Sequence, residues 1–416
     1  MHNKILNKLE KRLEMNFRLF MKNFSYMFAN NIITIIFALA LSVMLARVLS
    51  LEVFGQYNFI LSIFGLMAIL SLPGMNTSIT RSCARGFDGS FIEGTKIRVR
   101  WGLFGSFVLL LFGLYYYIGG SFLLSFGFVL AALFFISYYS FRTYQFFLLG
   151  KKRFKRYSAY LASITIIANL ITMIIAYYFR NLLIILFVLF GLTSLINFIF
   201  LFKTIKERKN DEIDKDLIPY GKHLTIINMV SMIKSYFDKI IVAFFLGFEF
   251  LAIYSVAIII PRQAKPLWTM ISNTIFSDLS RKSKKEAYSA VRSRFKYILL
   301  LEAAIIIIGI IILPPIISYF YSKKYIEAIF YAQLLMFLTL SGPGLILFSL
   351  SAAQKQLKKV YKISTIPPLI DIFLLVLLTP IYGLLGACIA TVIGGGLVPL
   401  IFSWFVVFGG SKKQKV

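Results

Sequence analysis

The stretch LLIILFVLFGLTSLINFIFLF, residues 182–202, contains no charged side chain. A helix needs about 20 mostly apolar residues to cross the hydrocarbon core of a bilayer, so this stretch can span a membrane. Apolar runs of similar length recur between clusters of charge along the whole chain, and about twelve of them reach spanning length. They cover residues 24–46, 54–80, 101–118, 121–149, 158–178, 182–202, 223–246, 252–277, 297–317, 325–352, 361–380 and 383–408.

The composition supports the same interpretation for the chain as a whole. Of its 416 residues, 59% are hydrophobic and 15% are charged, and the mean hydropathy is +0.81. Soluble domains carry about 25% charged residues, so a soluble enzyme and a disordered chain are both excluded. Because lipid offers no partners to backbone polar groups, runs of this kind form helices. We therefore expect an all-α integral membrane protein.

Several chemistries lack the residues that they need. Two histidines and two distant cysteines cannot form a zinc cluster, and we expect neither a metal nor a cofactor. The chain contains no G-x-x-x-x-G-K-[ST] phosphate-binding loop, which an ATP-driven pump would require. Outer connections of a few residues leave no room for an outer catalytic domain. We therefore expect that the chain is not an enzyme.

The net charge of +28 is distributed unevenly between the connections. One set of connections holds 36 of the 45 Lys and Arg residues, and the opposite set holds Arg47, Arg180, Lys323 and Lys324. Lys and Arg accumulate in cytoplasmic loops, so both termini are predicted to be cytoplasmic. This distribution accounts for the basic excess without a nucleic-acid partner.

The spans and loops divide the chain into five predicted segments. The N-terminal segment has apolar residues at helical spacing among basic ones, which is typical of a helix lying on anionic lipid. The loop between the halves mixes basic and acidic residues and is predicted to be a solvated linker. The segments are 1–23 (amphipathic, cytoplasmic), 24–202 (six-helix bundle), 203–222 (cytoplasmic linker), 223–408 (second six-helix bundle) and 409–416 (basic tail).

The second half of the chain echoes the first. LARVLSLEVFGQY (Leu45–Tyr57) aligns with VAFFLGFEFLAIY (Val242–Tyr254), and each stretch joins the first two spans of its half. Six spans per half would make the halves parallel repeats related by a pseudo-two-fold axis along the membrane normal. This arrangement predicts a central cavity and alternating access to a site near the middle of the membrane.

Charged residues inside the predicted spans are the candidates for that site. A charge at the centre of a bilayer costs roughly 2.5–3.5 kcal/mol, so such residues should face a cavity or a partner. Lys234 and Asp238 are four residues apart, which would allow them to pair on one helix. Because the cations outnumber the carboxylates, the cavity should attract an anion. The cations are Arg142, Lys234, Lys239, Arg262 and Lys265, and the carboxylates, which are candidates for ion coupling, are Asp238, Asp371 and Glu302.

An alternative role for these interior charges is mutual neutralisation that holds helices together. Three further cations lie at the ends of spans and are candidates for gates. Arg81 and Arg85 follow helical spacing at the inner end of the second span, where they could serve only as topogenic charges or form an inner gate that draws in an anionic head group. Arg47 is one of the few basic residues on the outer side, where it could act as a gate or pair with Glu52.

The stretch Leu45–Gly86 resembles the opening of the polysaccharide-biosynthesis flippases. These are the Wzx-type transporters of O-antigen and capsule repeat units in the multidrug/oligosaccharidyl-lipid/polysaccharide exporter superfamily. The resemblance rests on L-A-R-x-L, on E-x-F-G-x-Y, on L-P-G and on the basic end of the second span. It implies translocation of an undecaprenyl-diphosphate-linked oligosaccharide, and it extends to Arg47, Arg81 and Arg85.

This resemblance also implies a multi-pass protein of the bacterial cytoplasmic membrane, with membrane lipid and glycan polymerases as further partners. We expect a monomer. The alternative function is a cation-coupled antiporter of small molecules or drugs on the same fold. That branch often carries an acidic residue in the first span, and none lies between Phe24 and Ala46 here.

Overall fold

The computed structural model describes residues 17–280, 282–354 and 356–409. Every regular element in these ranges is helical, with no strand among them, which confirms the all-α prediction. Most of the predicted N-terminal amphipathic segment and of the basic tail lies outside the described residues. Contacts divide the chain into two compact units. Unit 1 comprises the chain up to Leu41 and Leu70–Thr225, and unit 2 comprises Ser42–Ile69 and the chain from Ile226 onward.

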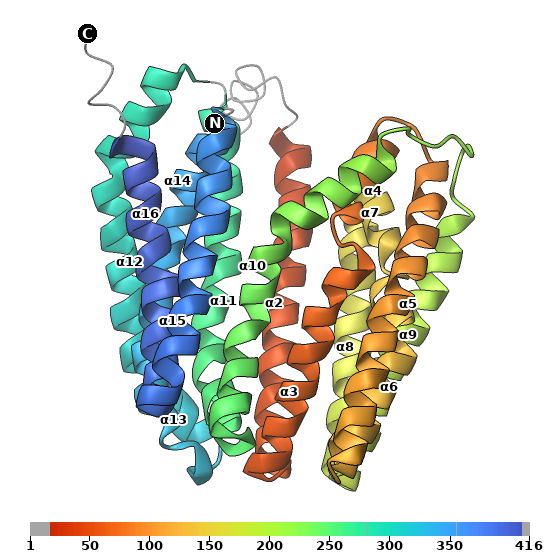
Figure 1. Ribbon diagram of the computed structural model, residues 1–416. Helices are drawn as coiled ribbons and strands as arrows, with labels where there is room; N and C mark the ends of the chain where they lie inside the picture. The colour runs from red at the N-terminus through yellow and green to blue at the C-terminus, as the bar shows by residue number, and fades with distance from the viewer. Residues whose placement is uncertain (1–16, 281, 355, 410–416) are drawn as a thin grey trace. The chain divides into compact units, whose positions relative to one another are not determined.

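Unit 1 is a bundle of long helices with two short helices at one end (Figure 1). Helix α6 packs against α5 and α9, and α9 also packs against α8, so these four helices form the body of the unit. The short helices α4 and α7 pack against each other. The helices that belong entirely to unit 1 are α4 (Met75–Ala84), α5 (Gly89–Ile118), α6 (Phe122–Tyr139), α7 (Thr143–Gly150), α8 (Phe154–Phe179) and α9 (Leu182–Ile205).

Two predicted spans in the first half of the chain are interrupted. The run 54–80 consists of α3 (Leu51–Met67), the 3₁₀ turn η1 (Ala68–Ser71) and α4, and the run 121–149 consists of α6 and α7. In the first break, Leu72 has a φ of 52° and Pro73 cannot donate a backbone hydrogen bond. The amide of Gly74 instead donates to the Thr225 hydroxyl at 3.0 Å. Apolar periodicity alone does not reveal these breaks because apolar residues continue on both sides of them, although Pro73 marks the first break and Arg142 lies in the second.

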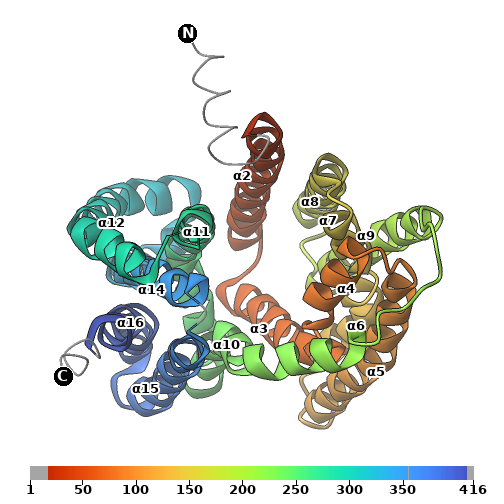
Figure 2. The ribbon, with the colours of Figure 1, turned by 90° about the horizontal axis from the view of Figure 1, so that it is seen from above.

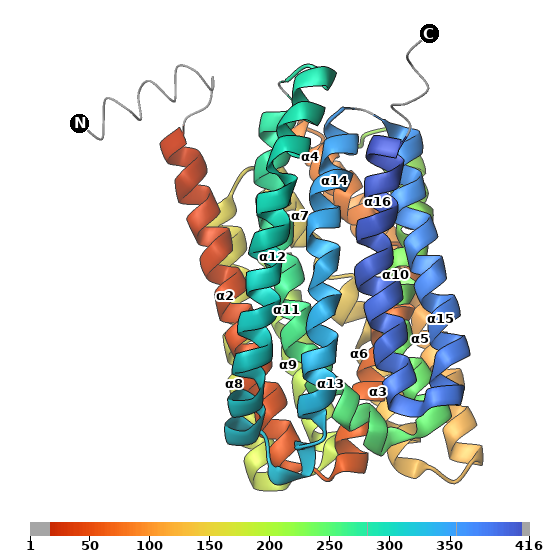
Figure 3. The same cartoon turned by 90° about the vertical axis from the view of Figure 1, so that its left-hand side faces the viewer.

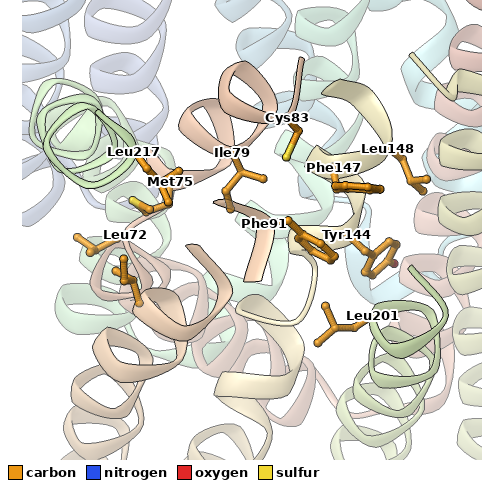
Figure 4. Close-up of a cluster of buried hydrophobic side chains, with 11 residues drawn as sticks. Leu72, Met75, Ile79, Cys83, Phe91, Tyr144, Phe147, Leu148, Leu201 and Leu217 are labelled. Carbon is orange, nitrogen blue, oxygen red and sulfur yellow. The ribbon is translucent and has the colours of Figure 1, made fainter. Parts of the chain in front are cut away.

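A buried apolar cluster joins α4 and α7 to the ends of the longer helices (Figure 4). Met75 and Ile79 of α4 and Phe147 of α7 are fully buried in it, and Phe91 of α5 lies 4.9 Å from Phe147, measured between ring centroids. Leu217 contributes from α10. The two short helices are therefore fixed by packing and not only by their connections.

Unit 2 is built around α11, which packs against α3, α13 and α14 (Figures 2 and 3). Helix α14 also packs against α16, and α16 packs against α15. Helices α2 (Phe17–Val48) and α10 (Leu217–Leu246) each run from unit 1 into unit 2. The other elements are α11 (Phe248–Leu279), α12 (Lys284–Phe320), η2 (Lys323–Tyr325), α13 (Ala328–Leu335), η3 (Met336–Leu340), α14 (Ser341–Ala353), α15 (Leu357–Val392), the π-helical turn η4 (Ile393–Leu397) and α16 (Val398–Phe408).

Nine segments of the described chain are long and apolar enough to cross a membrane. One of them, 358–408, holds the last two predicted spans, which are separated at Gly383, where φ is 59°. Helices α10 and α11 coincide with the seventh and eighth predicted spans but are not among the nine segments. They carry five of the interior charges, namely Lys234, Asp238, Lys239, Arg262 and Lys265. The multi-span helical fold is confirmed, and the pseudo-two-fold relation of two six-helix halves stays a prediction.

The contact-based units differ from the predicted bundles at residues 42–69. These residues belong to unit 2 because α3 packs closely on α11. A Cβ atom on Gly55 would lie 1.8 Å from the Phe248 carbonyl oxygen, so only glycine allows this approach. The two helices begin in the two aligned stretches, with Glu52 and Glu249 in their first turns.

The segment between α9 and α10 is docked on unit 1, where the sequence had suggested a solvated linker. Asp214 is buried, its amide donates to the Ser90 hydroxyl at 2.8 Å, and its carboxylate accepts from the Ser82 hydroxyl at 2.9 Å. The Asn210 side chain donates to the Gly86 carbonyl at 2.9 Å. Asp214 thus acts as a fixed partner of unit 1, whereas Asp211, Glu212 and Asp216 are exposed.

Candidate functional site

Helices α10 and α11 bring the interior charges of unit 2 together. Asp238 of α10 is buried and forms an ion pair with Arg262 of α11. The hydroxyl of Tyr254 donates to the same carboxylate oxygen at 2.7 Å and lies 3.0 Å from the Thr391 hydroxyl. Asp238 therefore joins three helices of unit 2 through polar contacts in an apolar setting.

A second ion pair links α10 to α15. The Lys234 ammonium lies 3.1 Å from Oδ2 of Asp371, whose carboxylate is buried. The predicted pairing of Lys234 with Asp238 along α10 is therefore wrong. Each residue pairs with a different neighbouring helix, because buried charges take the partner that packing supplies.

The glycine run of η4 makes room for this second pair. A Cβ on Gly394 would lie 2.4 Å from the Asp371 Cα, and a Cβ on Gly395 would lie 3.1 Å from the Lys234 ammonium. These glycines allow η4 to approach α15 closely. The structure shows that the contact surrounds a buried ion pair, and π-helical turns are common at functional sites.

Two further cations of unit 2 have no carboxylate partner in the described chain. Lys239 donates to the Asn58 side-chain oxygen at 3.1 Å. Lys265 is exposed and is repelled electrostatically by the like charges of Lys234 and Arg262. These four cations and the two carboxylates Asp238 and Asp371 are called the cation cluster from here on. Among the described residues the cluster keeps a surplus of two positive charges.

Sequence reasoning missed three polar members of this site. Asn58, Tyr254 and Thr391 lie within apolar runs and resemble ordinary buried polar residues. Only tertiary packing reveals their partners. The one signal was the alignment of the repeat, in which Tyr254 matches Tyr57.

Two other predicted residues stand apart from these contacts. Glu302 of α12 is fully buried beside Thr339 and Trp268. Arg142 belongs to unit 1, where it is the N-cap residue of α7 and an electrostatic neighbour of Arg98. The structure therefore groups four of the five predicted cations in one unit.

Arg98 is a buried cation that the sequence placed among the cytoplasmic loop charges. Its side chain is 3% exposed and donates to the Ser71 carbonyl and hydroxyl, each at 3.0 Å, and to the Asn76 side chain at 2.6 Å. Its carbonyl accepts from the Ser140 hydroxyl at 2.9 Å. Arg98 thus ties together the two helix breaks of unit 1.

Arg47, a gate candidate, caps a helix in unit 2. It donates to the carbonyls of Tyr319 and Phe320 at the end of α12, at 2.7 and 2.6 Å. Lys324 in turn donates to the Leu49 carbonyl beyond the end of α2. Cations satisfy the free carbonyls at helix C-termini, which gives these two basic residues a structural role on the side predicted to be the outer one.

The other two gate candidates contact the docked segment of unit 1. Arg85 lies 3.0 Å from the Asp214 carboxylate. Arg81 lies 3.8 Å from the Asp216 carboxylate and stacks over the Tyr220 ring at 4.8 Å. All of the cations predicted to act at gates therefore have structural partners, and their gate role stays a prediction.

Solved structures with similar folds cover most of the chain. Lipid II flippase MurJ, in an inward closed conformation, matches with a TM-score of 0.68 and 17% identity over 93% of this chain and 87% of that chain. An inward-facing multidrug resistance MATE transporter of the MOP superfamily matches with a TM-score of 0.60 and 12% identity over 92% and 96%. A MOP superfamily transporter from Pyrococcus furiosus, described by a reversed polarity of its binding pocket, matches with a TM-score of 0.57 and 14% identity over 95% of both chains. The fold is therefore that of MOP superfamily transporters.

The sequence comparison is more specific than the fold. No curated protein matches the chain. The model of the polysaccharide biosynthesis protein family matches residues 20–277, which is more than half of the chain and includes both aligned stretches of the repeat. This confirms the resemblance noted from Leu45–Gly86 and agrees with a location in a cytoplasmic membrane. The chain belongs to the polysaccharide biosynthesis protein family.

Proposed function

We propose that the chain is a flippase, not an enzyme, and that it moves an undecaprenyl-diphosphate-linked oligosaccharide across the bacterial cytoplasmic membrane. The cargo would be a repeat unit of O-antigen, capsule or a similar surface glycan. The cation cluster carries this proposal, since its positive surplus suits a diphosphate. Arg262 offers a planar fork to phosphate oxygens, and the lysines offer point charges. Alternating access between two bundles would move the bound group from one leaflet to the other.

Complementation tests this function. In a strain that lacks its own repeat-unit exporter, the wild-type chain should restore surface glycan. Arg262→Ala combined with Lys265→Ala should lower the restored glycan at least tenfold at equal membrane abundance. Arg100→Ala, an exposed cation of α5 in unit 1, is the matched control and should restore it fully. Full rescue by the double variant would disprove the role of the cation cluster.

The second candidate function is a cation-coupled antiporter, which the likeness to MATE transporters supports. In this function the carboxylates and not the cations would bind the cargo. The ion pairs argue against it, because Asp238 and Asp371 already hold internal cations. A chain that lowers the drug sensitivity of its host and restores no surface glycan would favour the antiporter.

Ion coupling belongs to the proposal as well. Intramembrane carboxylates commonly serve proton or ion relays, and Asp238, Asp371 and Glu302 are the buried examples here. Asp371→Asn in liposomes should lose the response of transport to an imposed ion gradient. A full response would exclude Asp371 from coupling. Glycan polymerase partners and a monomeric state stay predictions.

A further inference from the structure

The cation cluster is arranged in depth, with carboxylates behind cations. Asp371 and Asp238 are 2% and 3% exposed, whereas their partners Lys234 and Arg262 are 25% and 34% exposed. Lys265 is exposed and has no carboxylate partner among the described residues. A molecule that approaches the cluster therefore meets the cations first, and any anion competes with the carboxylates for them.

The two carboxylates are not held equally. Asp238 accepts from Tyr254 as well as pairing with Arg262, and Tyr254 lies in turn beside Thr391. Asp371 pairs with Lys234 and receives no hydrogen bond from a second side chain among the described residues, while Oδ1 of each aspartate is without a hydrogen-bond partner there. An ammonium on a flexible stem can leave a carboxylate more easily than a guanidinium fork can. Of the two ion pairs, Lys234–Asp371 is therefore the one that an incoming anion can separate more easily.

We propose that Asp371 is an internal competitor that sets the anion specificity of the cation cluster. This inference rests on the proposed function. In it, a diphosphate displaces Asp371 from Lys234 while Lys265 supplies the first attraction. A group with less charge, such as a single phosphate, gains too little from the two lysines to separate the pair. Asp371 would thereby keep the cluster closed to the phosphate groups of ordinary membrane lipids.

Binding of inorganic pyrophosphate and inorganic phosphate to the purified full chain, in nanodiscs of neutral lipid, tests this inference. Asp371→Asn keeps the shape of the side chain and removes its charge. It should raise the affinity for pyrophosphate about tenfold, which is about 1.4 kcal/mol. It should raise the affinity for phosphate by a larger factor, so that the ratio of pyrophosphate affinity to phosphate affinity falls.

The matched control is Asp88→Asn in unit 1. Asp88 is a buried carboxylate paired with Lys151, so the control removes the same kind of charge from the same kind of pair. Its pyrophosphate affinity should equal that of the wild type. An equal rise in both variants would overturn the inference, because it would show a general effect of net charge.

A second variant covers the case in which Asp371→Asn does not fold. Gly395→Ala places a methyl group 3.1 Å from the Lys234 ammonium and 3.5 Å from the Asp371 Oδ2, which loosens the pair without changing any charge. It should raise pyrophosphate affinity about twofold to threefold. Unchanged or weaker binding in the folded variants would overturn the inference and leave the proposed function standing. Absence of pyrophosphate binding in the wild type and the variants would overturn both.

Discussion

Each unit contains a buried pair of a lysine and an aspartate, and the two pairs differ in what surrounds them. In unit 1, Asp88 pairs with Lys151 through Oδ1 and accepts from the Lys209 amide through Oδ2 at 3.0 Å. In unit 2, one oxygen of Asp371 is without a hydrogen bond in the described chain, and Lys234 adjoins a glycine run. A carboxylate with both oxygens engaged by an ion pair or a hydrogen bond is held in place, whereas one with a single engaged oxygen retains the capacity to bind another group. The comparison makes the Asp88–Lys151 pair of unit 1 a structural one and the Asp371–Lys234 pair of unit 2 the exchangeable one of the proposal.

The largest expected effect contrasts a buried pair of unit 2 with an exposed pair of unit 1. Asp238→Ala leaves Arg262 and Tyr254 without their acceptor. Its free energy of unfolding should fall by about 3 kcal/mol, at the low end for a broken buried pair because Arg262 is partly exposed. Asp216→Ala, which removes the exposed partner of Arg81, should cost less than about 1 kcal/mol. Reversible unfolding in mixed micelles measures both, and equal losses would contradict the contrast.

The next effect concerns the glycine run. Gly394→Ala places a methyl group against the backbone of Asp371, so α15 and η4 must separate, at a cost of about 2 kcal/mol. Gly191→Ala in α9 of unit 1 makes only an ordinary contact with Phe134 at 3.4 Å, and it should stabilise by up to about 1 kcal/mol through helix propensity. The same unfolding measurement compares the two. A stable Gly394→Ala would show that the close approach is dispensable.

A third test addresses the structural charges of unit 1. Arg98→Lys keeps the charge and loses the fork that reaches Ser71 and Asn76, so unfolding should become easier by about 1.5 kcal/mol. Arg100→Lys, at an exposed position of the same helix, should change little. If glycan export also fell sharply in Arg98→Lys at normal abundance, unit 1 would hold a functional cation, and the assignment of charges to the two units would need revision.

The smallest expected effect depends on pH. Burial raises the pKa of Asp214, but hydrogen bonds from Asp216 and Ser82 and the charges of Arg85 and Arg81 outweigh it. The pKa in the folded chain therefore lies below the ordinary value of 3.8. The resulting stability is fully present above pH 3.8 and is lost as the pH falls through the folded pKa.

The melting temperatures of Asp214→Asn and of the wild type, compared across pH, measure this effect. The variant should melt at a lower temperature than the wild type at neutral pH, by an amount equivalent to less than about 1 kcal/mol. Below pH 3.8 the two melting temperatures should converge. A constant difference down to pH 3 would mean that the carboxylate charge of Asp214 does not hold the docked segment.

Several features were predictable from the sequence because they depend on local composition. Apolar runs of spanning length place helices wherever they occur, and the run 182–202 coincides with α9 within a few residues. The interior charges of α10 and α11 were identified as candidates because charge in a span is costly, and the structure groups four of these cations in one unit.

The sequence did not predict which charged side chains pair with one another. The i, i+4 spacing suggested a pair between Lys234 and Asp238, yet Asp238 pairs with Arg262 of the next helix and Lys234 with Asp371, far away in sequence. Arg98 was counted with loop cations because its neighbours in sequence are basic. Its burial follows from two helix breaks that no periodicity reveals. The docked segment looked solvated because five acidic residues and several lysines share it.

The sequence by itself determined that this chain is a helical membrane protein whose basic residues gather in one set of connections and whose spans hold few charges. These properties follow from the cost of placing polar groups in hydrocarbon, which each residue incurs independently of the fold. Only the tertiary structure decided which of those charges neutralise one another and which cations stay in surplus. That outcome depends on how helices pack, because an ion pair forms between side chains that packing brings within a few ångströms.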